Sequence, residues 1–327
     1  MSSGKASLTI AYLTYRQRPL WEWFVASLAR ELRDTPETHG AQVLVIDGRL
    51  WTDGDARRAE LRTLVERSDL AALASVEHHP PKPCVWQGPH RLTTHHEYFA
   101  ASSTRNTALA LARGSHVAFV DDLSVLLPGW AKAHLHAMAN GYVLGGTTTK
   151  YRNVQVDATG AVVGIDDHPP GRDSRLAWLP PGHGVVPLPG SALYGGTFSV
   201  PLEAALIVNG QDEACDSISG EDYDFGMRLE RAGWPVRFSR ACATIEDDAH
   251  HAQSVMRRLD KLVPGPDGPD SSHVLLRRLQ RETSRVWTLG EQPNLRELRD
   301  RVLLGEPFPV PTEPSVHWPD GQPLSEM

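Results

Sequence analysis

The chain has 327 residues, which is long enough to bury one large α/β core or two smaller ones. Its formal net charge of −7 argues against a protein that coats nucleic acid or an anionic membrane. Its three cysteines form no CxxC pair, and neither a secretory signal nor an apolar run of membrane-spanning length is evident, so we expect a cytoplasmic protein without a disulfide framework or zinc site.

Strands and helices alternate through the first part of the chain, which predicts a doubly wound α/β sheet. Apolar runs predict strands at 8–13 and 42–46, and a short third strand at 71–76. Apolar residues at helical spacing predict helices at 19–32 and 52–68. The same alternation continues with a helix at 98–113, a strand at 115–120, a helix at 128–140, a strand from 142 and a hairpin at 154–163.

The strand at 115–120 stops abruptly at two carboxylates, Asp121 and Asp122. Ligands of open α/β sheets bind beyond the carboxyl ends of the strands, and two carboxylates there can hold a divalent cation that binds a diphosphate. The alternative is that Asp121 and Asp122 only cap the following helix. The pattern of this strand leaves both interpretations open.

The second part of the chain is less regular. A Pro- and Gly-rich loop at 166–190 precedes Gly195 and Gly196, and Gly220 opens a helix that begins with Glu221 and Asp222. The remaining predicted elements are a short helix from 201, a strand at 236–245, helices at 255–262, 274–287 and 295–304, and an extended tail after 307.

Neither the dinucleotide fingerprint GxGxxG nor the phosphate loop GxxxxGK[ST] is present, so this is not an ordinary dinucleotide or ATP fold. Four other features follow one another along the chain. They are a strand ending at Thr14-Tyr15-Arg16, a strand ending at Asp47, Arg105-Asn106 before a strand ending at Asp121-Asp122, and Gly195-Gly196 followed by Gly220-Glu221-Asp222.

In these features the chain resembles the GT-A-type, inverting glycosyltransferases of family 2, from residue 8 to about 251. The resemblance implies a Rossmann-like mixed sheet flanked by helices, with a helical C-terminal extension. We accordingly expect a glycosyltransferase domain at 1–252, the helical extension at 253–305 and an extended or disordered tail at 306–327. The helices after Leu259 are expected to pack on the acceptor side or to form a homo-oligomer contact.

The resemblance also implies roles in donor binding. Thr14, Tyr15, Arg16 and Asp47 would bind the base and ribose of a nucleotide-diphosphate sugar, and Arg105 would approach the diphosphate. Gly195 and Gly196 would let the backbone approach the sugar closely. The alternatives are a capping role for Asp47 and an ordinary surface position for Arg105.

The family's D-x-D motif implies a divalent cation, Mn²⁺ or Mg²⁺, at Asp122 with help from Asp121. One of His250 and His251 would complete the metal site, because adjacent histidines rarely bind the same ion. Leu123 stands where the family usually has another carboxylate. The alternatives are therefore a metal site in a shifted register, or a site that binds metal weakly or not at all.

Glu221 and Asp222 match the family's acid pair at a helix start, which implies that Asp222 is the general base, with Asp224 as second choice. The implied reaction is inverting sugar transfer from the donor to an acceptor hydroxyl. The acceptor is left open among a carbohydrate, a lipid-linked sugar, a metabolite, a protein and a modified nucleic acid base. The alternatives in function are a nucleotidyltransferase and a non-catalytic nucleotide-sugar-binding module.

Overall fold

The computed structural model describes residues 7–84, 100–166, 173–177, 184–216, 220–251 and 292–308. These residues build one mixed sheet in the order β3-β2-β1-β4-β10-β6-β11-β5, with β9 added beside β11. The sheet strands are β1 (Leu8–Thr14), β2 (Ala41–Asp47), β3 (Ala74–His79), β4 (His116–Asp121), β5 (Ser124–Leu126), β6 (Val143–Tyr151), β9 (Val185–Pro187), β10 (Thr197–Pro201) and β11 (Val236–Asp247). A separate hairpin pairs β7 (Gln155–Val156) with β8 (Val162–Gly164).

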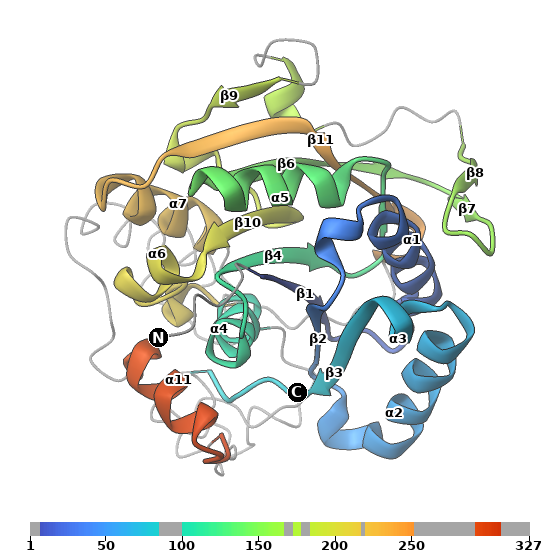
Figure 1. Ribbon diagram of the computed structural model, residues 1–327, viewed down its shortest axis with the longest axis horizontal. Helices are drawn as coiled ribbons and strands as arrows, with labels where there is room; N and C mark the ends of the chain where they lie inside the picture. The colour runs from blue at the N-terminus through green and yellow to red at the C-terminus, as the bar shows by residue number, and fades with distance from the viewer. Residues whose placement is uncertain are drawn as a thin grey trace, which may run out of the picture.

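Helices cover both faces of this sheet (Figure 1), which confirms the expected mixed α/β architecture. One face is covered by α1 (Trp21–Asp34), α2 (Leu50–Arg67), α3 (Leu70–Leu73) and α5 (Trp130–Asn140). The other face is covered by α4 (Ala101–Leu111), α6 (Leu202–Ile207), α7 (Glu221–Arg231) and α11 (Leu295–Leu303). The short α8 (Asp248–His251) follows β11, and 3-10 turns lie at Pro36–Thr38, Ser174–Ala177, Gly190–Ala192 and Glu213–Cys215.

Strand β1 shows why the sequences of the central strands are continuous apolar runs. All seven of its residues are buried, because successive side chains point to opposite faces and helices cover both. Ile10 and Tyr12 pack with α1, whereas Ala11 and Leu13 pack on the α4 side. Strands β1, β2 and β4 are parallel and in register, so their carboxyl ends lie at one edge of the sheet.

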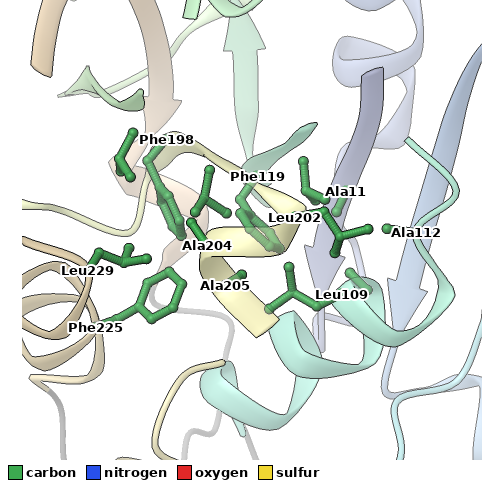
Figure 2. Packing of buried hydrophobic residues seen from close by; sticks show 14 of the residues in the cluster. Ala11, Leu109, Ala112, Phe119, Phe198, Leu202, Ala204, Ala205, Phe225 and Leu229 are labelled. Atoms are coloured by element: carbon green, nitrogen blue, oxygen red, sulfur yellow. The ribbon is translucent and has the colours of Figure 1, made fainter. Parts of the chain in front are cut away.

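The α4 side of the core fixes the position of α7 (Figure 2). Phe119 of β4 and Phe198 of β10 are neighbours with ring centroids 4.8 Å apart, and Phe225 of α7 packs edge-on against Phe198 at 6.2 Å. Leu202 of α6 and Leu109 of α4 belong to the same buried cluster. Phe225 is fully buried. Its burial therefore holds the start of α7 near the end of β4.

The structure differs from the predicted elements in three places. The segment Leu70–Leu73 is a turn of helix, and the third strand begins only at Ala74 and reaches His79. Strand β9 lies in the segment 166–190 that was predicted as a loop, and strand β5 lies in a segment for which no element was predicted. Each has three residues and pairs with β11, so its hydrogen bonds depend on a partner far away in the sequence.

At the C-terminal end, α11 agrees with the predicted helix at 295–304, and its Leu295 and Leu298 complete the core cluster beside α4. The predicted helices at 255–262 and 274–287 and the tail beyond residue 308 lie outside the described residues, so the division into three segments stays a prediction. Within the described ranges, no helix combines the length and apolar character needed to cross a membrane.

A chain of buried polar side chains connects β4, β10, α5 and β11. The Ser199 hydroxyl contacts His116 Nε2 at 2.9 Å and His134 Nδ1 at 2.8 Å, and His134 Nε2 contacts the Cys242 thiol at 3.2 Å. Both imidazoles are almost completely buried. Burial lowers the pKa of His116 from 6.5 to about 3 and lowers the pKa of His134 as well.

These two histidines make the fold sensitive to acid. Because the pKa of His116 is lower in the folded than in the unfolded chain, its stabilising effect is complete above pH 6.5 and is lost as the pH falls toward 3. We expect His116→Gln to flatten the decline in the free energy of unfolding below pH 6.5 by about 1.4 kcal/mol per pH unit. Denaturant unfolding at a series of pH values measures this slope. His136→Gln, at an exposed position of α5, should keep the wild-type slope, and a wild-type slope for His116→Gln would contradict the prediction.

Candidate functional site

The residues singled out in the sequence meet at the carboxyl edge of the parallel strands. Thr14 of β1 is in register with Asp47 of β2, and Leu13 is in register with Asp121 of β4. Strand β10 runs in the opposite direction, so Gly195 and Gly196, which precede it, lie at the same edge. The Asp121 N–H donates to the Gly196 carbonyl at 3.1 Å. The topology thus places segments from four distant parts of the chain beside one another.

Asp121 and Asp122 serve two different clusters. Asp122 accepts hydrogen bonds from the Thr14 hydroxyl at 2.9 Å and from Arg16 Nε at 2.7 Å. Asp121 instead accepts from Arg105 Nη2 at 3.0 Å. The divergence follows from the opposite orientation of adjacent side chains at a strand end. Neither carboxylate caps α5, whose N-terminus has no side-chain cap.

Leu123 terminates this strand in an unusual way. Its φ of 62° lies in the left-handed region, and its side chain is completely buried. A non-glycine residue in this conformation stores strain of about 1–3 kcal/mol, and such residues cluster at functional sites. The turn at Leu123 leaves Asp122 as the last carboxylate before β5.

Arg105 is the centre of the second cluster. The residue is 2% exposed. Its guanidinium contacts Asp121, the Gly195 carbonyl at 3.2 Å, Gln211 Oε1 at 3.3 Å and Glu221 Oε1 at 3.4 Å. This burial contradicts the alternative of an ordinary surface position for Arg105. In this arrangement Arg105 binds protein carboxylates and joins α4, β4, the turn before β10 and α7.

The start of α7 brings the acid pair into the same cluster. Gly220 precedes the helix with a φ of 92°, a conformation that favours glycine. The Gly195 N–H donates to Asp222 Oδ2 at 2.5 Å, and a Cβ on Gly195 would lie 2.5 Å from Arg105 Nη2. Gly195 is therefore needed for the close contact of the turn before β10 with Arg105 and Asp222. Asp224 points elsewhere, because its carboxylate pairs with Arg228 Nε at 2.7 Å.

Two carboxyl groups of this cluster, those of Glu221 and Asp121, have raised pKa values. Burial raises the pKa of Glu221 to about 8, with a further rise from the neighbouring Asp222 and a decrease from Arg105. Burial also raises the pKa of Asp121 to about 6, despite the opposing effect of Arg105. Perturbed carboxyl groups in a cluster at a sheet edge are typical of functional sites.

Asp47 lies deeper than expected for a residue that contacts a ribose or a base. It is completely buried, and its carboxylate accepts from Arg57 Nε at 2.6 Å, from Arg57 Nη2 at 3.1 Å and from the Arg49 N–H at 3.0 Å. His78 Nε2 is 3.1 Å from the same carboxylate. Arg57 also donates to the carbonyl oxygens of Arg16 and Gln17. Asp47 and Arg57 together position the loop that carries Arg16.

The sequence did not indicate Arg57 or His78 as residues of the site. Arg57 lies on α2, where it looks like any charged residue of an amphipathic helix, and its 5% exposure has no local sequence signal. Tyr15 is likewise turned into the protein. Its hydroxyl is 3.0 Å from the Thr104 hydroxyl, and burial raises its pKa. A Cβ on Gly48 would lie 2.2 Å from the Tyr15 ring, so Gly48 is needed for this approach.

The described residues do not fit the expected metal site. Asp122 is bound to Arg16 and Thr14, and His250 Nδ1 is 2.7 Å from Asp247 Oδ2. In the described part of the chain, no group of three or more His, Cys, Asp or Glu side chains could hold a metal ion. The side chain of His251 lies outside the described residues.

No protein-family model matches the chain, and no curated protein matches it in sequence. The solved structures that are similar to it include those of GalNAc-T7 and TarS. GalNAc-T7, solved with UDP, GalNAc and Mn²⁺, is 12% identical with a TM-score of 0.49, over 95% of this chain and 59% of that chain. TarS 1-349 from S. aureus is 14% identical with a TM-score of 0.47, over 89% of this chain and 78% of that chain.

The raised pKa of Glu221 predicts a dependence of stability on pH. The folded state holds this proton between the ordinary pKa of 4.5 and about 8, so stability falls as the pH rises through that range. Glu221→Gln cannot ionise at this position. We expect its melting temperature to fall less than that of the wild type between pH 6 and 9, and to lie a few degrees above that of the wild type at pH 9. Thermal unfolding at both pH values measures this difference. A wild-type difference in melting temperature between the two pH values would show that Glu221 ionises normally.

Proposed function

We propose that the protein is an inverting glycosyltransferase that uses a nucleotide-diphosphate sugar and transfers its sugar to an acceptor hydroxyl. The observation that carries this proposal is the position of the Asp222 carboxylate, which lies at the sheet edge beside Gly195 and the Asp121–Arg105 pair. Asp222 is half-buried, so an acceptor can reach it from solvent. It also begins a helix, where a carboxylate complements the helix dipole.

The motifs support the proposal because they lie together in space although they are far apart in the sequence. Thr14 and Arg16 lie at the end of β1, Asp121 and Asp122 lie at the end of β4, and Asp222 lies in the first turn of α7. Contacts nevertheless join all of these elements. A resemblance in sequence order alone does not require such an arrangement. Open α/β sheets bind ligands at this edge, so we assign the nucleotide to the β1 and β2 side and the acceptor to the α7 side.

In the proposed reaction the oxygen of the acceptor hydroxyl attacks the anomeric carbon of the sugar, and Asp222 accepts the proton of that hydroxyl. The bond between that carbon and the diphosphate oxygen breaks on the opposite face, and the nucleoside diphosphate leaves. One displacement inverts the anomeric configuration. The hydrogen bond from the Gly195 N–H to Asp222 Oδ2 orients the carboxylate for this step.

The products of donor turnover test the reaction class. Incubation of the full chain with a panel of nucleotide sugars should release free nucleoside diphosphate slowly, with water as acceptor. Release of nucleoside monophosphate and a sugar phosphate would instead indicate cleavage between the phosphates. Nucleotide-sugar binding without any turnover would indicate a non-catalytic binding module and would contradict the proposal.

The base assignment predicts a large effect on turnover. Asp222→Asn keeps the size of the side chain but cannot accept a proton at neutral pH. We expect a loss of about 10²–10⁴-fold in turnover, the usual contribution of a general base. Donor affinity should stay nearly unchanged, because we assign the nucleotide to the other side of the site. Nucleoside diphosphate release and calorimetric donor binding measure the two quantities.

Asp224→Asn is the matched control, because it removes a carboxylate from the same turn of α7 that is already paired with Arg228. We expect it to keep most of the turnover. An inactive Asp224→Asn beside a normal Asp222→Asn would move the base to Asp224. Normal turnover in both variants would contradict the proposed mechanism.

A further inference from the structure

Each carboxylate at the ends of β4 and β11 lies against a basic side chain of the protein itself. The shortest distances within these pairs run from 2.7 to 3.3 Å. The pairs are Asp121 with Arg105, Asp122 with Arg16, Glu246 with Lys150, and Asp247 with His250. A divalent cation binds by collecting several carboxylate or other oxygen ligands. Three of the carboxylates here are instead paired with an arginine or a lysine of the protein, and Asp247 lies against the His250 imidazole.

Arg16 lies where the resemblance places the metal ion. Its Nε is 2.7 Å from Asp122 Oδ1, and its Nη1 donates to the His250 carbonyl oxygen at 3.4 Å. The guanidinium therefore bridges the end of β4 and α8, the two elements expected to supply the metal ligands. The two carboxylate oxygens of Asp122 are contacted by Arg16 and Thr14.

The position of Arg16 is fixed from its backbone side as well. Its N–H donates to the Thr14 hydroxyl at 3.1 Å, and its carbonyl accepts from Arg57 Nη2 at 3.1 Å. Arg57 is in turn held by the buried carboxylate of Asp47. The Arg16 and Asp122 side chains are only 9% and 12% exposed. A metal ion at Asp122 would have to displace this guanidinium, and breaking a largely buried ion pair is costly.

We infer that the Arg16 guanidinium takes the place of a divalent cation at Asp122, and that the protein binds nucleoside diphosphates without a divalent metal ion. Arginine suits this role, because its planar guanidinium is always charged and matches the geometry of phosphate oxygens. This inference rests on the proposed function, since it concerns the diphosphate of the same donor.

The test measures calorimetric binding of UDP, GDP, ADP and dTDP to the full chain, in EDTA and in excess Mn²⁺ or Mg²⁺. For the wild type we expect the tightest diphosphate to change in affinity by less than about 3-fold between these conditions. Arg16→Gln should weaken its binding by about 10–100-fold, the scale of a lost charge-assisted hydrogen bond. Arg16→Lys keeps the charge without the planar fork and should recover part of the loss.

Arg18→Gln is the matched control, because Arg18 is exposed two residues further along the same loop, and it should bind as the wild type does. Binding that a metal ion strengthens 10-fold or more in the wild type would overturn the inference while leaving the proposed function intact. Equal binding by Arg16→Gln and the wild type would also overturn it. Absence of binding by every diphosphate, with and without metal, would contradict the proposed function itself and the inference with it. The comparison of wild-type binding in EDTA and in excess metal ion tests the inference even if a variant fails to fold.

Discussion

The buried guanidinium of Arg105 is the contact on which the candidate site depends. A charge removed from water is costly unless it is paired and hydrogen-bonded, and Arg105 meets this requirement with groups from β4, the turn before β10 and α7. Removing one partner of such a pair costs about 3–5 kcal/mol, because the other charge stays buried and unpaired. The strand-end carboxylate Asp121 and the start of α7 are therefore held in one arrangement.

A second guanidinium organises the opposite side in the same manner. Arg57 is bound by the buried Asp47, packs over the Trp21 ring at 4.7 Å, and holds the carbonyl oxygens of the loop after β1. That loop carries Arg16 to Asp122. Arg57 and Arg105 thus act as internal anchors on either side of β4. A site assembled from strand ends and helix starts in this way is preorganised, since its side chains are already hydrogen-bonded in place.

The contacts of Arg57 and Arg105 change the roles that the sequence motifs suggested for Asp47 and Arg105. Asp47 and Arg105 were expected to face a ligand, yet in this structure both are turned toward protein partners. A carboxylate after a strand looks the same in sequence whether it binds a ribose or an arginine. Arg57 had no local signal at all, since an arginine in an amphipathic helix is normally exposed. Its burial depends on Asp47, which approaches it only through the packing of α2 against α1, α3 and β3.

The α/β class, most strands and helices, and the chain positions of the carboxylates and glycines of the site could be predicted from the amino-acid sequence. These features are local, because burial on both faces gives continuous apolar runs and turns select glycine. Contacts between distant segments make β5 and β9 strands, bring α11 into the core, and set which basic side chain each carboxylate contacts. The partner of a charge depends on distances between segments far apart in the chain. In this protein those distances pair Asp122 with Arg16 and leave Asp222 beside Gly195.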